Sequence, residues 1–144
     1  MRVADILKGK GSGVMSVKPS DTIGSVAQRL RLSGVGVMIV SRDGHSLDGI
    51  ISERDIAYAL PAHADELHEM RVSDLMTVQV VTCSPDDLIA DVARIMTNRR
   101  VRHIPVKQGD KLVGVISVGD MLKHRLSEIE LEANVLRDIA LAGR

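Results

Sequence analysis

Two serine and aspartate pairs form the clearest chemical pattern in this chain of 144 residues. Ser52 and Asp55, and likewise Ser117 and Asp120, stand three residues apart where an apolar run gives way to a helical pattern. At that spacing the serine can cap a helix N-terminus and the aspartate can reach back to the serine amide. The free amides at a helix start also favour phosphate, and a carboxylate there can accept hydrogen bonds from both hydroxyls of a ribose. Helix capping alone and nucleotide contact are both open on this pattern, and the two roles are compatible.

Basic residues gather in two places. Three arginines and a histidine form a cluster over Arg99–His103, which is most simply a solvated face but could also contact phosphate. Lys10 lies in the sequence Gly-Lys-Gly-Ser-Gly at residues 9–13, which lacks the Walker A spacing and follows no strand pattern. We interpret that segment as a flexible loop, with a phosphate contact as the alternative.

Composition argues against several function classes. Nineteen basic and nineteen acidic residues cancel, unlike the charge of a general nucleic-acid binder, and Tyr58 is the only aromatic residue available for base stacking. Cys83 is the only cysteine, so an intramolecular disulfide is impossible. His63 and His68 are five residues apart, which is off the spacing that places two metal ligands on one helix face. With no nucleophile elbow or dinucleotide-binding glycine pattern, we expect a protein without catalysis, metal or catalytic cofactor.

The cellular location follows from what the sequence lacks. The longest apolar stretch, residues 35–40, is far shorter than the roughly 20 residues of a membrane span. The N-terminus has no apolar signal region. We therefore expect a cytoplasmic protein that does not enter a membrane.

The chain contains an internal repeat, which becomes visible when it is aligned with itself. A three-residue gap and a single-residue gap bring four segments of the first half into register with four of the second. The matched segments are 3–7 with 72–76, 23–30 with 89–96, 37–40 with 103–106, and 49–55 with 114–120. Since each copy alone is too small to bury a sheet face well, the two copies should pack on each other.

Each copy has the same predicted order of elements. An apolar strand, at residues 14–17 or 78–81, leads to an amphipathic helix, and Gly34 closes the first of these helices. Two strands joined by a polar turn follow, which is typical of a hairpin, and a last helix starts at Ser52 or Ser117. The fold class is therefore mixed α/β (α+β), with two tandem β-α-β-β-α units.

The repeat also sets the predicted boundaries. Residues 1–60 form the first unit, with Pro61 at or just beyond its last helix, and 61–71 form a polar linker. Residues 72–126 form the second unit, and 127–144 form a helical extension.

The terminal helix has a stripe of apolar residues. They recur at alternating spacings of four and three, at Leu122, Leu126, Ile129, Ala133, Leu136 and Ala140. Such a stripe could pair with another helix, but it is short for a coiled coil, so packing onto its own domain is equally open.

The duplicated unit, with Gly-apolar-apolar-Ser-x-x-Asp at the start of each last helix, resembles the CBS domain pair, or Bateman module, named after cystathionine beta-synthase. The sequences Ser-Glu-Arg-Asp-Ile at 52–56 and Arg-His-Ile-Pro-Val at 102–106 are similar to those of stand-alone bacterial CBS-pair proteins. The resemblance implies a pseudo-twofold pair of units that often dimerises. It also implies that adenosine ligands such as AMP, ADP, ATP, NAD or S-adenosylmethionine bind in clefts between the repeats.

The resemblance further implies roles for individual residues. Arg102 and His103 would line the cleft that holds Asp55, with Arg54 adding charge, whereas Lys8 or Lys10 could supply the charge near Asp120. The two clefts should therefore be unequal, with adenine held between aliphatic side chains. The expected nucleotide-binding residues are Lys10, Val14, Val37, Ser52, Arg54, Asp55, Val80, Arg102, His103, Pro105, Ser117 and Asp120.

Together these patterns predict a non-catalytic, adenine-nucleotide-sensing regulatory module that forms a homodimer and signals to a downstream protein which the sequence does not name. One alternative is a structural dimerisation scaffold without a ligand. Another is a weak nucleic-acid binder that uses the Arg99–Arg102 cluster, which the neutral overall charge disfavours.

Overall fold

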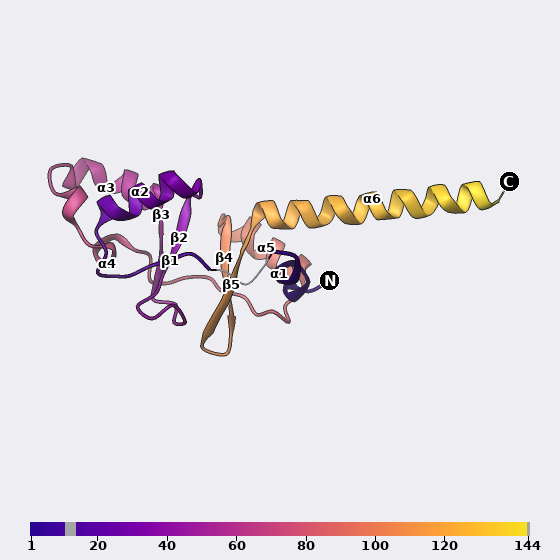
Figure 1. The fold of residues 1–144 in the computed structure, drawn as a ribbon, viewed down its shortest axis with the longest axis horizontal. Helices are drawn as coiled ribbons and strands as arrows, with labels where there is room; N and C mark the ends of the chain where they lie inside the picture. The colour runs from indigo at the N-terminus through magenta and orange to yellow at the C-terminus, as the bar shows by residue number, and fades with distance from the viewer. Residues whose placement is uncertain (11–13, 144) are drawn as a thin grey trace.

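A computed structural model describes residues 1–10 and 14–143. A flexible loop was predicted at residues 9–13, but Gly9 and Lys10 belong to the first helix, so that part of the prediction is wrong, and residues 11–13 lie outside the described part. Two similar units lie side by side, each built on an antiparallel hairpin, and a long terminal helix projects from the second unit (Figure 1). The mixed α/β fold with two tandem repeats is confirmed.

The first unit contains a small sheet flanked by helices. Strands β2 (Val37–Val40) and β3 (Gly49–Ser52) are antiparallel, and β1 (Ser16–Val17) pairs with β2 in parallel. Helix α2 (Ile23–Ser33) ends as predicted at Gly34, whose φ of 70° is a left-handed conformation that suits glycine.

The last helix of the first unit, α3 (Glu53–His63), is longer than expected. It continues two residues beyond Pro61, so the prediction that the helix ends at or before this proline is wrong. A proline has no amide hydrogen and cannot donate to the carbonyl four residues before it, so α3 continues past Pro61 without that one hydrogen bond.

The second unit repeats the hairpin and its flanking helices. Strands β4 (His103–Gln108) and β5 (Lys111–Ser117) are antiparallel, with α5 (Ile89–Arg99) before them and α6 (Val118–Ala142) after them. Residues 78–81, predicted as a strand, form none. The reason is that Thr77 bridges to Ile50 of β3 whereas Cys83 bridges to Val106 of β4, so the segment crosses from one sheet to the other.

The two hydrophobic cores do not follow the order of the repeats. Helix α1 (Val3–Lys10) buries Val3 and Ile6 in the core of the second unit. The turn η1 (Leu67–Glu69) and helix α4 (Val72–Leu75) bury Leu67 and Val72 in the core of the first unit. Each sequence repeat thus contributes its leading helix to the other unit, which ties the two units together.

The glycine at the start of each repeated motif allows another segment of the chain to lie close against the strand. A Cβ at Gly49 would lie 2.7 Å from the backbone oxygen of Thr77, and a Cβ at Gly114 would lie 2.6 Å from Cδ2 of Leu7 in α1. The motif therefore begins with glycine because another segment crosses the strand there.

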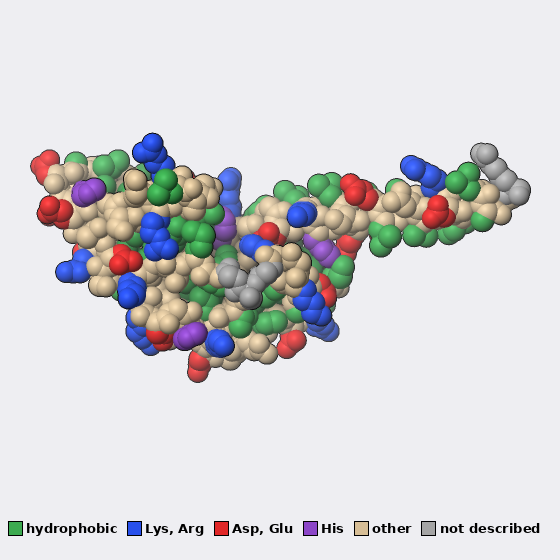
Figure 2. All heavy atoms as spheres, in the orientation of Figure 1, with side chains coloured by type: hydrophobic (Ala, Val, Ile, Leu, Met, Phe, Trp, Pro, Cys, Tyr) green, Lys and Arg blue, Asp and Glu red, His purple; other side chains and the backbone are tan. Residues whose placement is uncertain are grey.

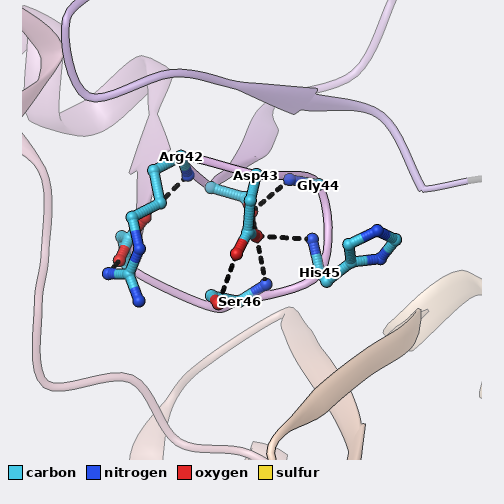
Figure 3. Close-up of polar contacts among 7 residues, drawn as sticks. Arg42, Asp43, Gly44, His45 and Ser46 are labelled. Atoms are coloured by element: carbon cyan, nitrogen blue, oxygen red, sulfur yellow. Dashed lines mark hydrogen bonds and ion pairs between the residues drawn. The ribbon is translucent and has the colours of Figure 1, made fainter.

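The β2–β3 turn is organised by one carboxylate (Figure 3). Asp43 accepts hydrogen bonds from the amides of His45 (2.8 Å) and Ser46 (2.7 Å) and from the Ser46 hydroxyl (2.9 Å). These bonds, first that from the Ser46 amide, hold the pKa of the Asp43 carboxyl far below its ordinary value. The His45 carbonyl in turn accepts a hydrogen bond from the Leu112 amide at 2.8 Å, which joins the turn to β5 of the other unit.

Candidate functional site

A cleft of about 260 Å³ opens between the two units, and we call it the interunit cleft. Strands from both hairpins form its walls, and the end of α1 together with the residues before β1 closes one side. Most lining side chains are aliphatic, and they leave a slot with a few polar groups at one end. The lining residues are Leu7, Lys10, Val14, Met15, Val35, Val37, Ile39, Ile50, His103, Pro105, Gly114, Val115 and Ser117.

Lys10 lines the polar end of the interunit cleft and is paired there with Asp120, a residue that lines a neighbouring hollow and not the cleft itself. Lys10 Nζ lies 2.7 Å from Asp120 Oδ2 and 2.9 Å from the carbonyl oxygen of Val115. Lys10 reaches this position because α1 packs on the second unit. A cation supplied by the first repeat therefore meets the carboxylate of the second, and of the two lysines considered from the sequence, Lys8 and Lys10, it is Lys10 that makes the contact.

Asp120 is also part of a helix cap. Its Oδ2 accepts a hydrogen bond from the Ser117 amide (2.9 Å), and its own amide donates to Ser117 Oγ (3.0 Å), which forms the capping box at the start of α6. Partial burial is the largest single influence and would raise the pKa of the Asp120 carboxyl. The Lys10 ammonium and the Ser117 groups together outweigh it and lower that pKa, so the carboxylate is ionised at neutral pH.

His103 lines this same cleft and not the one predicted. We expected it beside Asp55, next to Arg102, but it lies with Lys10 and Ser117. Burial, and then the nearby Lys10 and Arg102 charges, lower the pKa of His103, while Asp120 opposes that shift. The imidazole is therefore neutral at pH 7 and can offer one donor and one acceptor to a ligand.

The corresponding pair in the first unit has a different setting. Ser52 and Asp55 form a complete capping box, with Asp55 Oδ2 accepting from the Ser52 amide (2.9 Å) and hydroxyl (3.0 Å). Arg54 and Arg102 line a separate surface hollow together with Arg100, but Asp55 is not among its lining residues. The two settings differ, because Lys10 of the interunit cleft is paired with a carboxylate, whereas the charged residues that line the arginine hollow are all arginines.

The expected binding residues therefore divide into three groups. Lys10, Val14, Val37, His103, Pro105 and Ser117 line the interunit cleft, and Asp120 contacts Lys10 at its edge. Arg54 and Arg102 line the arginine hollow, whereas Ser52 and Asp55 form the cap of α3 and are lining residues of neither cavity. Val80 is half-buried and lines none of the cavities found among the described residues, because the predicted strand around it does not form.

Sequence reasoning missed several lining residues. Leu7 and Met15 join the cleft because of how α1 and the chain after it cross to the other unit. Val35 and Ile39 lie on β2 or just before it, at two-residue intervals from Val37. The alternation of side chains along an extended chain could have identified those two.

Other potentially reactive groups are in unsuitable surroundings. Cys83 is buried, and burial followed by the nearby Asp87 charge raises the pKa of its thiol to about 11, which makes it a poor nucleophile. Among residues 1–10 and 14–143, no three histidine, cysteine or acidic side chains are grouped so that they could hold a metal ion.

Within the same residues, no helix has the length and apolar character to cross a membrane.

Comparisons with known proteins agree with this architecture. The model of the CBS domain family matches residues 3–62 and 72–127. The chain is 27% identical over 134 residues to the CBS domain-containing protein CBSX3, mitochondrial, of Arabidopsis thaliana, covering 88% of this chain and 65% of that protein. The chain thus spans only about two thirds of the length of that relative.

Solved structures show the same fold. A CBS-domain-containing protein of Agrobacterium tumefaciens superposes with a TM-score of 0.81 at 34% identity, covering 87% of this chain and 99% of that one. The CBS domain pair of protein MJ0100, solved in complex with 5′-methylthioadenosine and S-adenosyl-L-methionine, superposes with a TM-score of 0.74 at 23% identity. That superposition covers 89% of this chain and 98% of MJ0100's.

Proposed function

The chain belongs to the CBS domain family, whose paired domains are regulatory modules, and from that premise we propose that it senses an adenosine-containing small molecule. The ligand is of the class of AMP, ADP, ATP, NAD or S-adenosylmethionine, and it binds in the interunit cleft without being chemically changed. The Lys10 and Asp120 pair at the end of an aliphatic slot is the observation that carries this proposal.

The cleft offers a matching group for each part of such a ligand. An adenine ring fits between the aliphatic walls, where Val37 of one unit and Pro105 of the other contribute. The ionised Asp120 carboxylate can accept hydrogen bonds from ribose hydroxyls. Lys10, released from part of its contact with Asp120, favours a phosphate or other anionic group.

A relative supports the ligand class. The CBS domain pair of MJ0100 was solved with two adenosyl compounds, and both contain the adenine and ribose that this cleft would accommodate. Neither of those two compounds contains a phosphate. Whether this chain prefers such a compound or a nucleotide therefore depends on whether Lys10 binds a phosphate group.

Binding would regulate through the position of the two units. The cleft is walled by both hairpins, and α6 starts at Ser117 on its edge. A ligand that fits one arrangement better than another shifts the population toward it. We propose that the module acts as a homodimer and that a partner protein recognises the favoured arrangement.

Calorimetric titration with each candidate ligand in turn tests the proposal, using protein stripped of bound ligand. We expect saturable binding with a clear preference for one of them. Asp120→Ala should weaken the tighter site roughly 100-fold or more, since it removes two hydrogen bonds to a charged acceptor.

Asp55→Ala is the matched control, because it removes the same capping-box aspartate from the other unit. It should leave the tighter site intact and affect only a weaker second one. If stoichiometry and affinity are unchanged in both variants, the site assignment is wrong. If no ligand produces heat or raises the melting temperature, the protein is a scaffold, since an excess of about 100-fold over Kd should add about 2.7 kcal/mol.

A further inference from the structure

We propose that α6 pairs with α6 of a second copy of this chain, in parallel and in register, as a short two-stranded coiled coil. The helix is 25 residues long, or roughly 37 Å at 1.5 Å per residue, and most of it extends beyond the body (Figure 1). This inference goes beyond the proposed function and does not depend on a ligand.

The distal part of α6 has no partner among residues 1–10 and 14–143 of its own chain. Every residue from 129 to 143 is exposed, which excludes packing of this part onto its own domain. Figure 2 shows hydrophobic side chains along the projecting helix between charged ones. The large members of the apolar stripe are exposed to 60% at Leu126, 46% at Ile129 and 67% at Leu136. A helix with so much apolar surface in water favours association.

The spacing of the stripe assigns the heptad positions. Leu126, Ala133 and Ala140 occupy a positions, whereas Leu122, Ile129 and Leu136 occupy d positions. Positions g are then Arg125 and Glu132, and positions e include Glu130 and Arg137. These e and g side chains border the seam and determine which orientation of two helices is favourable.

The charges select the parallel orientation. In a parallel pair, a g residue faces the e residue five positions later on the other helix. Arg125 then faces Glu130 of the second copy, and Glu132 faces Arg137 of the second copy. Both contacts join opposite charges, and because the pair has twofold symmetry each contact occurs twice.

Antiparallel pairing with the whole stripe overlapped is opposed by the same charges. It would set Glu130 against Glu130 of the other copy and Glu132 against its own counterpart near the centre. Shifting the antiparallel overlap by one heptad in either direction would pair opposite charges. It would place Leu136 opposite Gly119 in one direction and Leu126 opposite Gly143 in the other, and would leave that leucine poorly packed. Only the parallel arrangement satisfies both the charges and the leucine layers.

The base of α6 adds apolar surface to the same association. A groove between α5 and α6 is lined by Leu88, Ala93, Val118 and Leu122, among others, and Leu122 is also the first leucine of the stripe. Parallel pairing brings both copies of this groove to the same end of the coiled coil. The groove can therefore extend a seam that is short for an independent coiled coil.

Sedimentation of the ligand-free full chain tests the pairing. Leu136→Lys should weaken the dimer by at least about 100-fold, since a leucine side chain of each copy loses its burial. Leu131→Lys is the matched control, because Leu131 is 65% exposed on another face of the same helix and lies outside the stripe. Equal dimer affinity in the two variants, or a monomeric wild-type protein, would overturn the proposal.

Two further measurements test orientation and register. Leu136→Cys should form a disulfide-linked dimer on oxidation, because only parallel, in-register pairing places residue 136 beside itself, and the wild-type protein with buried Cys83 is the control. Glu132→Arg should weaken the dimer several-fold, and Glu132→Arg combined with Arg137→Glu should restore it. A dimer in which Leu136→Cys does not cross-link, or in which the double variant is weaker than the single one, would refute parallel pairing.

Discussion

Replacing Gly49 by alanine should destabilise the protein, whereas the same change at Gly114, the equivalent position of the second repeat, should not. The new methyl group at Gly49 would lie 2.7 Å from the Thr77 carbonyl oxygen, and at Gly114 it would lie 2.6 Å from the end of the Leu7 side chain. The distances are nearly equal, but a backbone oxygen fixed by hydrogen bonds cannot move as the tip of a leucine can.

The expected magnitude follows from the bonds at each position. Thr77 and Ile50 exchange two backbone hydrogen bonds, of 3.0 and 2.8 Å, and displacing the segment costs about 0.5 to 1.5 kcal/mol for each. Alanine in a strand regains about 0.5 to 1 kcal/mol relative to glycine. Gly49→Ala should therefore lose about 1 to 2 kcal/mol, or roughly 3 to 7 °C in melting temperature. At Gly114 a rotamer change of Leu7 costs about as much as the substitution regains, so the change should be within about 2 °C.

Thermal unfolding followed by circular dichroism measures both variants, and urea unfolding gives the free energies independently. Because the two glycines occupy equivalent places in equivalent hairpins, differences in strand propensity largely cancel. A Gly114→Ala variant as unstable as Gly49→Ala would refute the reasoning that the rigidity of the neighbour decides the cost.

Three further outcomes are expected. The folded state lowers the pKa of His103, first through burial, so the unfolded chain binds a proton at higher pH than the folded one does. The free energy of unfolding should therefore fall as pH drops below about 6.5. Urea unfolding between pH 7.5 and 5 should show a smaller fall for His103→Gln than for the wild-type protein. Cys83, buried with a thiol pKa of about 11, should react with iodoacetamide at pH 8 far more slowly in the native protein than in urea, and similar rates would contradict its placement. Ser52→Ala and Ser117→Ala should each lower the free energy of unfolding by about 1 kcal/mol through loss of the cap, and chemical denaturation showing no change would mean that the caps are dispensable.

Sequence reasoning succeeded where the determinants are local. The hairpins, the helix end at Gly34 and both capping boxes depend on residues within a few positions of one another, and all are present. The contact between Lys10 and Asp120 was also anticipated, although through resemblance to a family and not through local pattern.

Errors arose where distant segments decide the structure. Residues 78–81 have the apolar sequence of a strand, but their ends bridge to different sheets, and nothing in the segment itself shows this. Arg102 and His103 were assigned to one cleft although neighbours in an extended chain point to opposite sides. That misplacement was avoidable, whereas the docking of α1 on the second unit was not, because Val3 and Val72 stand in matching positions and neither indicates which core it will enter.

The exchange of leading helices makes each half of the chain depend on the other half for a complete core. A single copy of the repeat would lack the helix that completes its own core, and it could obtain one only from another molecule. Joining two copies in one chain turns that bimolecular encounter into an intramolecular one, with an effective concentration in the millimolar range for a short connection. A cut in the connecting segment would therefore leave each half without the helix that completes its core until the two halves associate.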